Sequence, residues 1–273
     1  FLSQERELAM PITCDLPLRI LNQAEFGAIA FDVMHHAFEI HNEMGRFFDE
    51  PVYQEQMQQR LGQRADREVI VRATYLDFEK PFRLDLVVDR GGVFELKTVA
   101  ELHDSHRSQL IHYLMMTGLE HGKLINFRPD KIEHEFVNSL ESQAARRSFD
   151  IKTLRWTNAV PCASRMQEVV TGFLRDWGTG LDLQLYTDAV THFFGGRERV
   201  EQDIEVMSRE RRIGRQTVRL VDSNTAFKLT ALHRDLDAFE SHTRRFLEHT
   251  RLERVLWVNM VLSEVSFTSI EKK

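Results

Sequence analysis

The sequence has few cysteines and no long apolar segment, and each absence narrows the class of protein. Two cysteines in 273 residues are too few for a disulfide framework or for a zinc site built from thiolates. No uninterrupted apolar run approaches the ~18 residues that cross a bilayer, and the first residues lack the basic-then-apolar pattern of a signal peptide. We therefore expect a cytoplasmic protein with reduced cysteines and no membrane partner.

Several common cofactor-binding and catalytic motifs are also missing. The chain contains no Walker A loop, no dinucleotide-binding glycine fingerprint and no G-x-S-x-G elbow. Its 12 histidines fall in no pattern of zinc ligands, so surface or phosphate-facing roles are favoured over a metal site. ATP-driven chemistry is therefore not indicated.

The charge of the chain is unevenly distributed. The net charge of −6 argues against a protein coated in basic residues for indiscriminate nucleic-acid binding. Residues 1–140 carry 15 Lys and Arg against 23 Asp and Glu, whereas residues 141–273 carry 21 against 19. The two halves thus have net charges of −8 and +2 and differ electrostatically.

The second half of the chain repeats the first. A shift of 133 positions, the interval from Gly45 to Gly178, aligns identical residues in both halves. Further identical pairs at this shift include Tyr53 and Tyr186, Gly62 and Gly195, Asp89 and Asp222, and Asn126 and Asn259. We therefore predict two copies of one domain, at residues 1–140 and 163–273, joined by a linker over residues 141–162.

The hydrophobic periodicity predicts an α/β domain in each copy. The elements expected in the first copy are helices at 26–44 and 51–61, strands at 69–71, 82–88 and 93–99, a helix at 106–118, and strands at 123–127 and 132–137. The second copy repeats this order with helices at 165–177 and 185–194, strands near Ile204, Thr217 and Ala226, a helix at 239–250 and a strand at 255–261.

Polar residues whose side chains can take part in catalysis or metal binding lie together at one predicted hairpin. Side chains alternate along a strand, so Glu95 and Lys97 point to the same face. The turn at residues 89–92 places Asp85 opposite Glu95, or within one residue of it. Gln109 and Tyr113 lie one turn apart on the next helix and can overlook the hairpin, and Glu50 can supply a third acid.

Two converging carboxylates form a hard, oxygen-rich site that suits Mg²⁺ or Mn²⁺ rather than zinc or copper. Such an ion polarises a phosphoryl oxygen and lowers the pKa of a bound water, while Lys97 holds the nucleophile or stabilises the developing negative charge. Phosphodiester hydrolysis fits this set of groups. A solvated hairpin that carries a Glu-Lys pair is the structural alternative.

A family resemblance rests on several segments in order. They are Gly-Arg-Phe-Phe-Asp-Glu-Pro-Val-Tyr at 45–53, Arg-Leu-Asp-Leu-Val-Val at 83–88, Glu-Leu-Lys-Thr at 95–98, Gln-Leu-x-x-Tyr at 109–113 and Leu-Ile-Asn-Phe at 124–127. Together they resemble the bacterial G-x-x-E-x-x-Y proteins, which are placed in the PD-(D/E)XK nuclease superfamily. The resemblance covers about residues 26–138.

The resemblance implies a restriction-endonuclease-like αβββαβ core, with a mixed sheet flanked by helices, and Mg²⁺-dependent cleavage of nucleic acid. It implies Asp85 and Glu95 as metal ligands and Lys97 as the catalytic lysine. It further implies Glu50 as the helix acid and Gln109 as an orienting residue, with Tyr113 completing the Gln-x-x-x-Tyr element.

This chain departs from the family pattern at two positions. Phe47 stands where G-x-x-E-x-x-Y has its glycine, and Leu84 stands where the PD signature has its proline. Neither change removes a functional side chain. Phe47 can alter the turn before Glu50, because glycine allows a positive φ that phenylalanine disfavours.

The predicted site is absent from the second copy. The counterparts of Glu50, Asp85, Glu95, Lys97, Gln109 and Tyr113 are Leu183, Val218, Lys228, Thr230, Arg245 and His249. The second copy therefore resembles a pseudo-nuclease, whose expected roles are to bind substrate, a protein partner or another copy of the chain as a homodimer. Candidate nucleic-acid contacts are Arg211, Arg212 and Arg215 in this copy and His106 in the first.

The leading hypothesis is a Mg²⁺-dependent deoxyribonuclease with an inactive C-terminal duplicate. A noncatalytic nucleic-acid- or protein-binding module is the main alternative, and the net charge of −8 over residues 1–140 favours it. A ribonuclease is the next alternative.

Overall fold

The structure, a computed structural model, describes residues 11–157 and 160–272. The residues at the N-terminus that lack a signal-peptide pattern lie outside this described part. The chain divides into two compact units, Phe1–Gln143 (unit 1) and Ala144–Lys273 (unit 2). No helix of the described residues is both long and apolar enough to span a bilayer.

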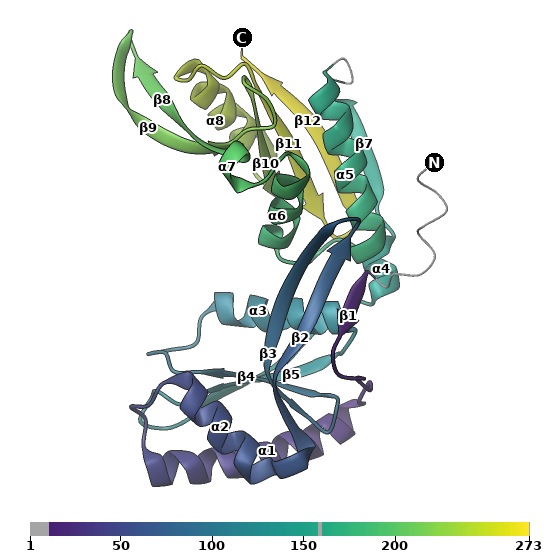
Figure 1. The fold of residues 1–273 in the computed structure, drawn as a ribbon, viewed down its shortest axis with the longest axis vertical. Helices are drawn as coiled ribbons and strands as arrows, with labels where there is room; N and C mark the ends of the chain where they lie inside the picture. The colour runs from purple at the N-terminus through teal and green to yellow at the C-terminus, as the bar shows by residue number, and fades with distance from the viewer. Residues whose placement is uncertain (1–10, 158–159, 273) are drawn as a thin grey trace. The chain divides into compact units, whose positions relative to one another are not determined.

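Unit 1 is a mixed α/β fold in which a mixed sheet is flanked by helices, as predicted (Figure 1). Its elements are β1 (Ile12–Cys14), α1 (Gln23–Met44), α2 (Glu50–Leu61), the 3₁₀ helix η1 (Gly62–Arg64), β2 (Ala65–Tyr75), β3 (Phe78–Val88), β4 (Gly92–Lys97), α3 (Asp104–Thr117), β5 (His121–Asn126) and β6 (Glu133–Asn138). The strands follow the order β1-β2-β3-β4-β5-β6; the β4–β5 pair is parallel, and the other pairs of these six strands are antiparallel. Helices α1 and α2 cover one face of the sheet and α3 covers the other.

Helix α1 forms where the sequence predicts it, because both of its ends are specified locally. The side chain of Asn22 accepts hydrogen bonds from the Ala24 and Glu25 amides at 3.0 Å, and Glu25 accepts one from the Asn22 amide at 2.9 Å. Gly45 ends the helix with a φ of 75°. The buried face of α1 consists of Phe26, Ile29, Ala30, Val33, Met34, Ala37 and Ile40.

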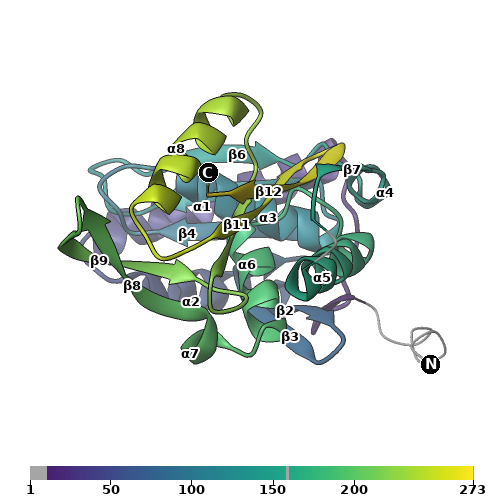
Figure 2. The same ribbon diagram turned by 90° about the horizontal axis from the view of Figure 1, so that it is seen from above.

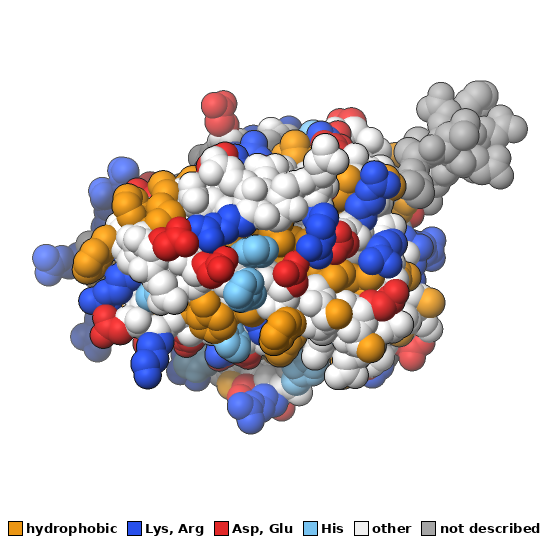
Figure 3. Space-filling model, turned by 90° about the horizontal axis from the view of Figure 1, so that it is seen from below, with side chains coloured by type: hydrophobic (Ala, Val, Ile, Leu, Met, Phe, Trp, Pro, Cys, Tyr) orange, Lys and Arg blue, Asp and Glu red, His pale blue; other side chains and the backbone are white. Residues whose placement is uncertain are grey.

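The outer side of α1 and α2 carries side chains of both signs. Arg60 pairs with Glu39 at 3.1 Å, and Arg64 pairs with Asp32 at 2.7 Å. Figure 3 shows this side of unit 1, where acidic and basic side chains intermingle with histidines. These partly exposed ion pairs orient the helices but contribute little to stability individually.

The β3–β4 hairpin determines which side chains point to each face of the sheet. Asp89 and Arg90 adopt positive φ values of 50° and 59°, and the Gly91 amide donates to the carbonyl of Val88 at 3.2 Å. Two consecutive residues with positive φ form the type I′ turn that matches strand twist. The hairpin buries Leu86, Val88, Phe94 and Leu96 against α1 and α2. The intervening side chains therefore face α3.

Unit 2 is also α/β (Figure 2). Its elements are α4 (Gln143–Arg147), which begins at the boundary, β7 (Asp150–Arg155), α5 (Pro161–Trp177), α6 (Leu183–Phe193), α7 (Arg197–Val200), β8 (Glu201–Ser208), β9 (Arg211–Arg219), β10 (Thr225–Thr230), α8 (Leu236–Glu248), β11 (Arg254–Val261) and β12 (Glu264–Glu271). A four-stranded sheet has the order β10-β11-β12-β7, and β8 and β9 form a separate two-stranded ribbon. Helix α8 packs on β11 and β12, whereas α6 contacts β10.

Residues 141–162, predicted as a linker, contain regular structure. Strand β7 pairs in parallel with β12 and completes the sheet of unit 2. In α4, the wholly buried Arg146 donates to the carbonyls of Trp177 and Thr179 at 3.0 Å. Its helix and strand bond to distant parts of unit 2, a tertiary effect that the polar composition of the segment does not reveal.

The two units share strand registers. In β4–β5, Lys97 pairs with Asn126, and in β10–β11, Thr230 pairs with Asn259. The next pair of strands repeats the agreement, because Asn126 faces Glu133 and Asn259 faces Ser266. In these three pairs of positions the residue of unit 1 lies 133 positions before its counterpart, the same interval that separates Gly45 from Gly178.

Buried polar side chains repeat the same bonds in both units. The hydroxyl of Tyr53 donates to the Gly45 carbonyl at 2.8 Å, and that of Tyr186 donates to the Gly178 carbonyl at 2.6 Å. Asn126 donates to the Val99 carbonyl at 2.9 Å, and Asn259 donates to the Leu232 carbonyl at 2.9 Å. In each unit the same asparagine also accepts from the amide of that residue.

Helices α3 and α8 follow this register as well. Leu114 and Leu247, again 133 positions apart, are both wholly buried. In this register the residues of α8 at the places of Gln109 and Tyr113 are His242 and Phe246. The counterparts of Gln109 and Tyr113 expected from the sequence are instead Arg245 and His249, which corresponds to a shift of 136 positions in this helix.

Candidate active site

Strand alternation brings Asp85, Glu95 and Lys97 to one face of the hairpin. Leu86 and Leu96 point into the core beneath α1 and α2, so these three residues point toward the α3 face. All three are buried: Glu95 is 0% exposed, Asp85 7% and Lys97 9%. The sequence prediction that Asp85 lies close to Glu95 agrees with the register, in which their neighbours Leu86 and Phe94 pair directly.

Lys97 is the centre of the cluster. Its Nζ lies 2.6 Å from Glu95 Oε1, 3.8 Å from Asp85 Oδ2 and 3.8 Å from Glu50 Oε2. The amide of Leu96 donates to Asp85 Oδ2 at 2.9 Å, which fixes this carboxylate on the hairpin. The structure thus gathers three of the predicted acids around one ammonium group.

Glu95 has one carboxylate oxygen without a partner. Its Oε2 is buried and accepts no hydrogen bond from any described residue. An unpaired carboxylate oxygen is costly to bury, because it has lost its bonds to water. A divalent cation beside Glu95 and Asp85 would satisfy this oxygen, so the donor set fits Mg²⁺ or Mn²⁺.

The pKa values of the two buried acids reflect the same shortage of partners. Burial raises the pKa of Asp85 to about 7, although Lys97 opposes the rise and Glu50 adds to it. Burial also raises the pKa of Glu95 to about 8, and repulsion from Asp85 adds to this rise. Both carboxyl groups therefore take up protons near neutral pH unless a further cation stabilises their ionised forms.

Lys97 keeps its charge in this environment. Burial on its own lowers the pKa of an ammonium group, but the attraction of Glu95 and Asp85 outweighs burial and raises the pKa of Lys97. Lys97 is therefore fully protonated at neutral pH. It serves as a positive charge and a hydrogen-bond donor rather than as a base.

Helix α2 delivers the third acid. Glu50 is its first residue, and Pro51 follows at a position where the missing amide hydrogen costs no helical bond. Phe47 does not adopt a positive φ, so its replacement of glycine leaves the turn before Glu50 unstrained. Burial raises the pKa of Glu50, opposed by Lys97.

Gln54 is a site residue that the sequence analysis missed. It is 4% exposed, and its Nε2 lies 3.5 Å from Glu50 Oε1. Its position one helical turn after Glu50 is the signal that could have identified it.

Gln109 and Tyr113 form a pair on α3. Gln109 Nε2 donates to the hydroxyl of Tyr113 at 3.0 Å. Burial raises the pKa of Tyr113 to about 12; Gln109 opposes the rise, and Glu95 and Asp85 add to it. The charges of Glu95 and Asp85 therefore act on Tyr113, but no hydrogen bond joins Gln109 or Tyr113 to these acids in the described part of the chain.

His106 has a structural role at the start of α3. Its Nδ1 accepts a hydrogen bond from the His103 amide at 3.0 Å, and the two rings stack with centroids 5.7 Å apart. Burial, followed by the charge of Lys97, lowers the pKa of His106, so the ring is neutral at physiological pH.

The predicted arginine contacts belong to unit 2. Arg211, Arg212 and Arg215 are exposed residues of β9. Arg212 lies 3.4 Å from Glu205 on the neighbouring strand. They are available to a polyanion, and they belong to a different unit from the acid cluster.

Among residues 11–157 and 160–272, no group of three or more His, Cys, Asp or Glu side chains is arranged as a ready-made metal cage. Lys97 lies among the acids instead, so a cation would share the cluster with the ammonium group. Mg²⁺ commonly binds through one or two carboxylates and keeps several waters, which matches the pair Asp85 and Glu95.

Comparison with known proteins finds a family match within unit 1. Residues 28–138 match the family described as the PD-(D/E)XK nuclease superfamily, which confirms that part of the sequence prediction. A solved structure titled "Crystal structure of SSO0001" is similar, with 19% identity and a TM-score of 0.28 over 45% of this chain. The chain covers 61% of that structure's length. No curated protein matches the sequence.

Proposed function

We propose that unit 1 is a nuclease that hydrolyses phosphodiester bonds with Mg²⁺ or Mn²⁺, and that its substrate is DNA. The observation that carries this proposal is the buried cluster of Asp85, Glu95 and Lys97, in which one oxygen of Glu95 accepts no hydrogen bond from the residues that the structure describes. The superfamily match over residues 28–138 supports the same chemistry.

Asp85 and Glu95 would hold the cation. When bound, the cation supplies positive charge that polarises a phosphoryl oxygen and lowers the pKa of a water molecule. The burial of both carboxylates strengthens their attraction for a cation, because little water competes there. The amide of Leu96 keeps Asp85 in place.

Lys97 would stabilise the negative charge that develops on the phosphate. Its ammonium group carries three donors, and its contact with Glu95 Oε1 at 2.6 Å uses one of them. Its distances of 3.8 Å from Asp85 and Glu50 are longer than a hydrogen bond, so the ammonium group can turn toward a phosphoryl oxygen, where an oriented positive charge in a site of low polarity lowers the barrier.

Glu50, Gln54, Gln109 and Tyr113 would position the reacting groups. Glu50 approaches Lys97 to 3.8 Å, and Gln54 orients Glu50. Gln109 is held by its bond to Tyr113. Supporting contacts of this kind typically affect metal affinity or activity by about 10- to 100-fold.

We further propose that unit 2 is an inactive copy of unit 1 that serves in binding or assembly. The shared registers and the repeated tyrosine and asparagine bonds support this descent. The acids are replaced at corresponding positions by Leu183, Val218 and Lys228. The residue at the place of Lys97 is Thr230, whose hydroxyl is already bonded to Trp257 and Asn259.

Cleavage assays test the proposal. Purified protein is incubated with plasmid, linear duplex DNA, single-stranded DNA and RNA, with Mg²⁺, Mn²⁺ or EDTA. Lys97→Ala and Glu95→Gln should abolish cleavage, whereas Lys131→Ala and Glu101→Gln, matched changes at exposed positions, should retain it. Cleavage that survives both site variants would refute the assigned site.

The same assays separate the alternatives. The net charge of −8 over residues 1–140 favours a noncatalytic binding module, which would bind nucleic acid in these reactions without cleaving it. A ribonuclease would cleave only RNA, again with dependence on Lys97. Light scattering of the full chain tests whether unit 2 assembles a homodimer.

A further inference from the structure

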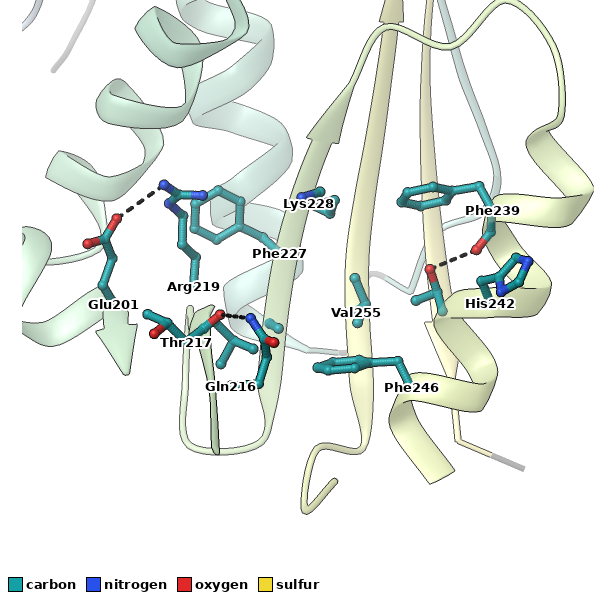
Figure 4. A pocket seen from close by; sticks show the side chains of 13 residues that line it. Glu201, Gln216, Thr217, Arg219, Phe227, Lys228, Phe239, His242, Phe246 and Val255 are labelled. Atoms are coloured by element: carbon teal, nitrogen blue, oxygen red, sulfur yellow. Dashed lines mark hydrogen bonds and ion pairs between the residues drawn. The ribbon is translucent and has the colours of Figure 1, made fainter. Parts of the chain in front are cut away.

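Unit 2 contains a cavity of about 520 Å³ between the end of its ribbon, its sheet and helix α8 (Figure 4). The volume falls within the range of ~300–1,000 Å³ that is usual for small-ligand sites. The residues that matter for its chemistry are Arg219, Lys228, Phe239, His242 and Phe246.

The cavity lies where unit 1 has its acid cluster. Val218 and Lys228 line it, at the positions of Asp85 and Glu95, respectively. His242, at the position of Gln109 in the register of α8, lines it as well. Replacement of an acid by a lysine reverses the local charge, so a place suited to a cation in unit 1 is suited to an anion in unit 2.

Lys228 is the available cation. Its side chain is exposed and forms no ion pair or hydrogen bond within residues 11–157 and 160–272. The neighbouring Arg219 lies 3.1 Å from Glu201, which is bonded to Arg197 as well. Glu201 is the one acid among the described residues that line the cavity, and these ion pairs neutralise it, which leaves the charge of Lys228 for a ligand.

Aromatic rings form another part of the wall. Phe239 and Phe246 are only partly buried and line the cavity from α8. The ring of Phe239 packs against Trp257 with centroids 4.5 Å apart, and Trp257 Nε1 donates to Thr230 at 2.8 Å. This hydrogen bond holds the indole, and therefore the ring that rests on it, in a fixed position.

We propose that this cavity binds a nucleotide, with its phosphate beside Lys228 and its base against Phe239 and Phe246. The assignment rests on the binding role proposed above for unit 2. Nucleotides combine an anion with a flat π surface, and proteins that bind single strands pair basic residues with aromatic rings. A purely apolar ligand would leave Lys228 without a counter-charge.

The test measures binding of a fluorescein-labelled dT₁₀ strand to the full chain by anisotropy, with dTMP as unlabelled competitor. EDTA is present throughout, so metal-dependent cleavage by unit 1 cannot influence the result. Lys228→Ala and Phe246→Ala are each expected to weaken binding about tenfold. Lys152→Ala removes the same charge from β7, which does not line the cavity, and should change affinity less than about twofold.

Salt dependence gives an independent readout. Loss of one phosphate contact to a single strand lowers the slope of log K against log salt by about 0.7, so Lys228→Ala should show this decrease. Phe246→Ala should weaken binding with an unchanged slope. Thermal melting identifies any variant that fails to fold. In that case Lys228→Glu, a change at an exposed position, is measured in the same binding assay.

The outcomes distinguish the sources of the nucleotide. Competition by dTMP supports a site for a single nucleotide, whereas dT₁₀ binding that depends on Lys228 but resists dTMP supports a site for a nucleotide within a strand. Absence of dT₁₀ binding, equal affinities of Lys228→Ala and Lys152→Ala, or binding of duplex DNA alone would overturn the proposal. Failure here leaves the cleavage assays of unit 1 unaffected, so the two proposals are tested separately.

Discussion

The affinity of unit 1 for Mg²⁺ is predicted to rise steeply between about pH 6 and about pH 8.5, because both proposed ligands must lose protons to bind a metal. Burial raises the pKa of Asp85 to about 7 and that of Glu95 to about 8. At pH 6, protonation should weaken binding about tenfold at Asp85 and about a hundredfold at Glu95, or about a thousandfold together. Above pH 8 the penalty nearly vanishes.

Titration calorimetry in two buffers with different ionisation enthalpies measures the affinity and the protons released. About two protons should leave at pH 6 and fewer than about one at pH 8.5. Asp85→Asn should bind Mg²⁺ more weakly and release about one proton fewer, whereas Asp104→Asn, whose carboxylate is fully exposed, should behave as wild type. An affinity that is constant or falls with pH would refute the assignment of these ligands.

Three further predictions concern stability and positioning. Because the pKa values of Asp85 and Glu95 are raised in the fold, both groups stabilise the metal-free protein below about pH 4, and this stabilisation is lost as pH rises to about 8. The free energy of unfolding measured in urea should therefore fall over this range, and Mg²⁺ should restore it. Tyr186→Phe removes a buried bond to the Gly178 carbonyl and should cost about 1–2 kcal/mol in unfolding free energy, and a cost near zero would contradict its role. Glu50→Gln should slow cleavage about 10- to 100-fold, measured as initial rates on linear DNA, and unchanged rates would remove Glu50 from the site.

The acid cluster could be predicted from the sequence because its geometry depends on local rules. Alternation along a strand places Glu95 and Lys97 on one face, and the turn at Asp89 sets the register of the hairpin. The contact of Glu50 with Lys97 joins two elements, so periodicity does not encode it, and the sequence names Glu50 as a third acid without its partner.

The start of unit 2 could not be predicted in this way. The alternation of β7 is weak, and its Ile151 is 39% exposed, so its place beside β12 depends on pairing rather than on a buried pattern. Arg146 resembles a linker residue in the sequence, yet it is wholly buried by its bonds to two carbonyls. These features arise from tertiary contacts that single-sequence patterns do not encode.

The cavity of unit 2 could not be predicted from the sequence for a different reason. The sequence shows that Lys228 replaces Glu95, but it does not show that Phe239 and Phe246 leave a space beside this lysine.

The most direct test of Glu95 as a ligand of a catalytic metal compares wild type with Glu95→Gln in one cleavage assay on linear DNA with Mg²⁺. Glutamine keeps the size of the side chain but removes the charge that would hold the metal. Wild type should cleave, EDTA should stop the reaction, and Glu95→Gln should be inactive while still folded. Cleavage by Glu95→Gln at the rate of wild type would show that Glu95 does not hold a catalytic metal.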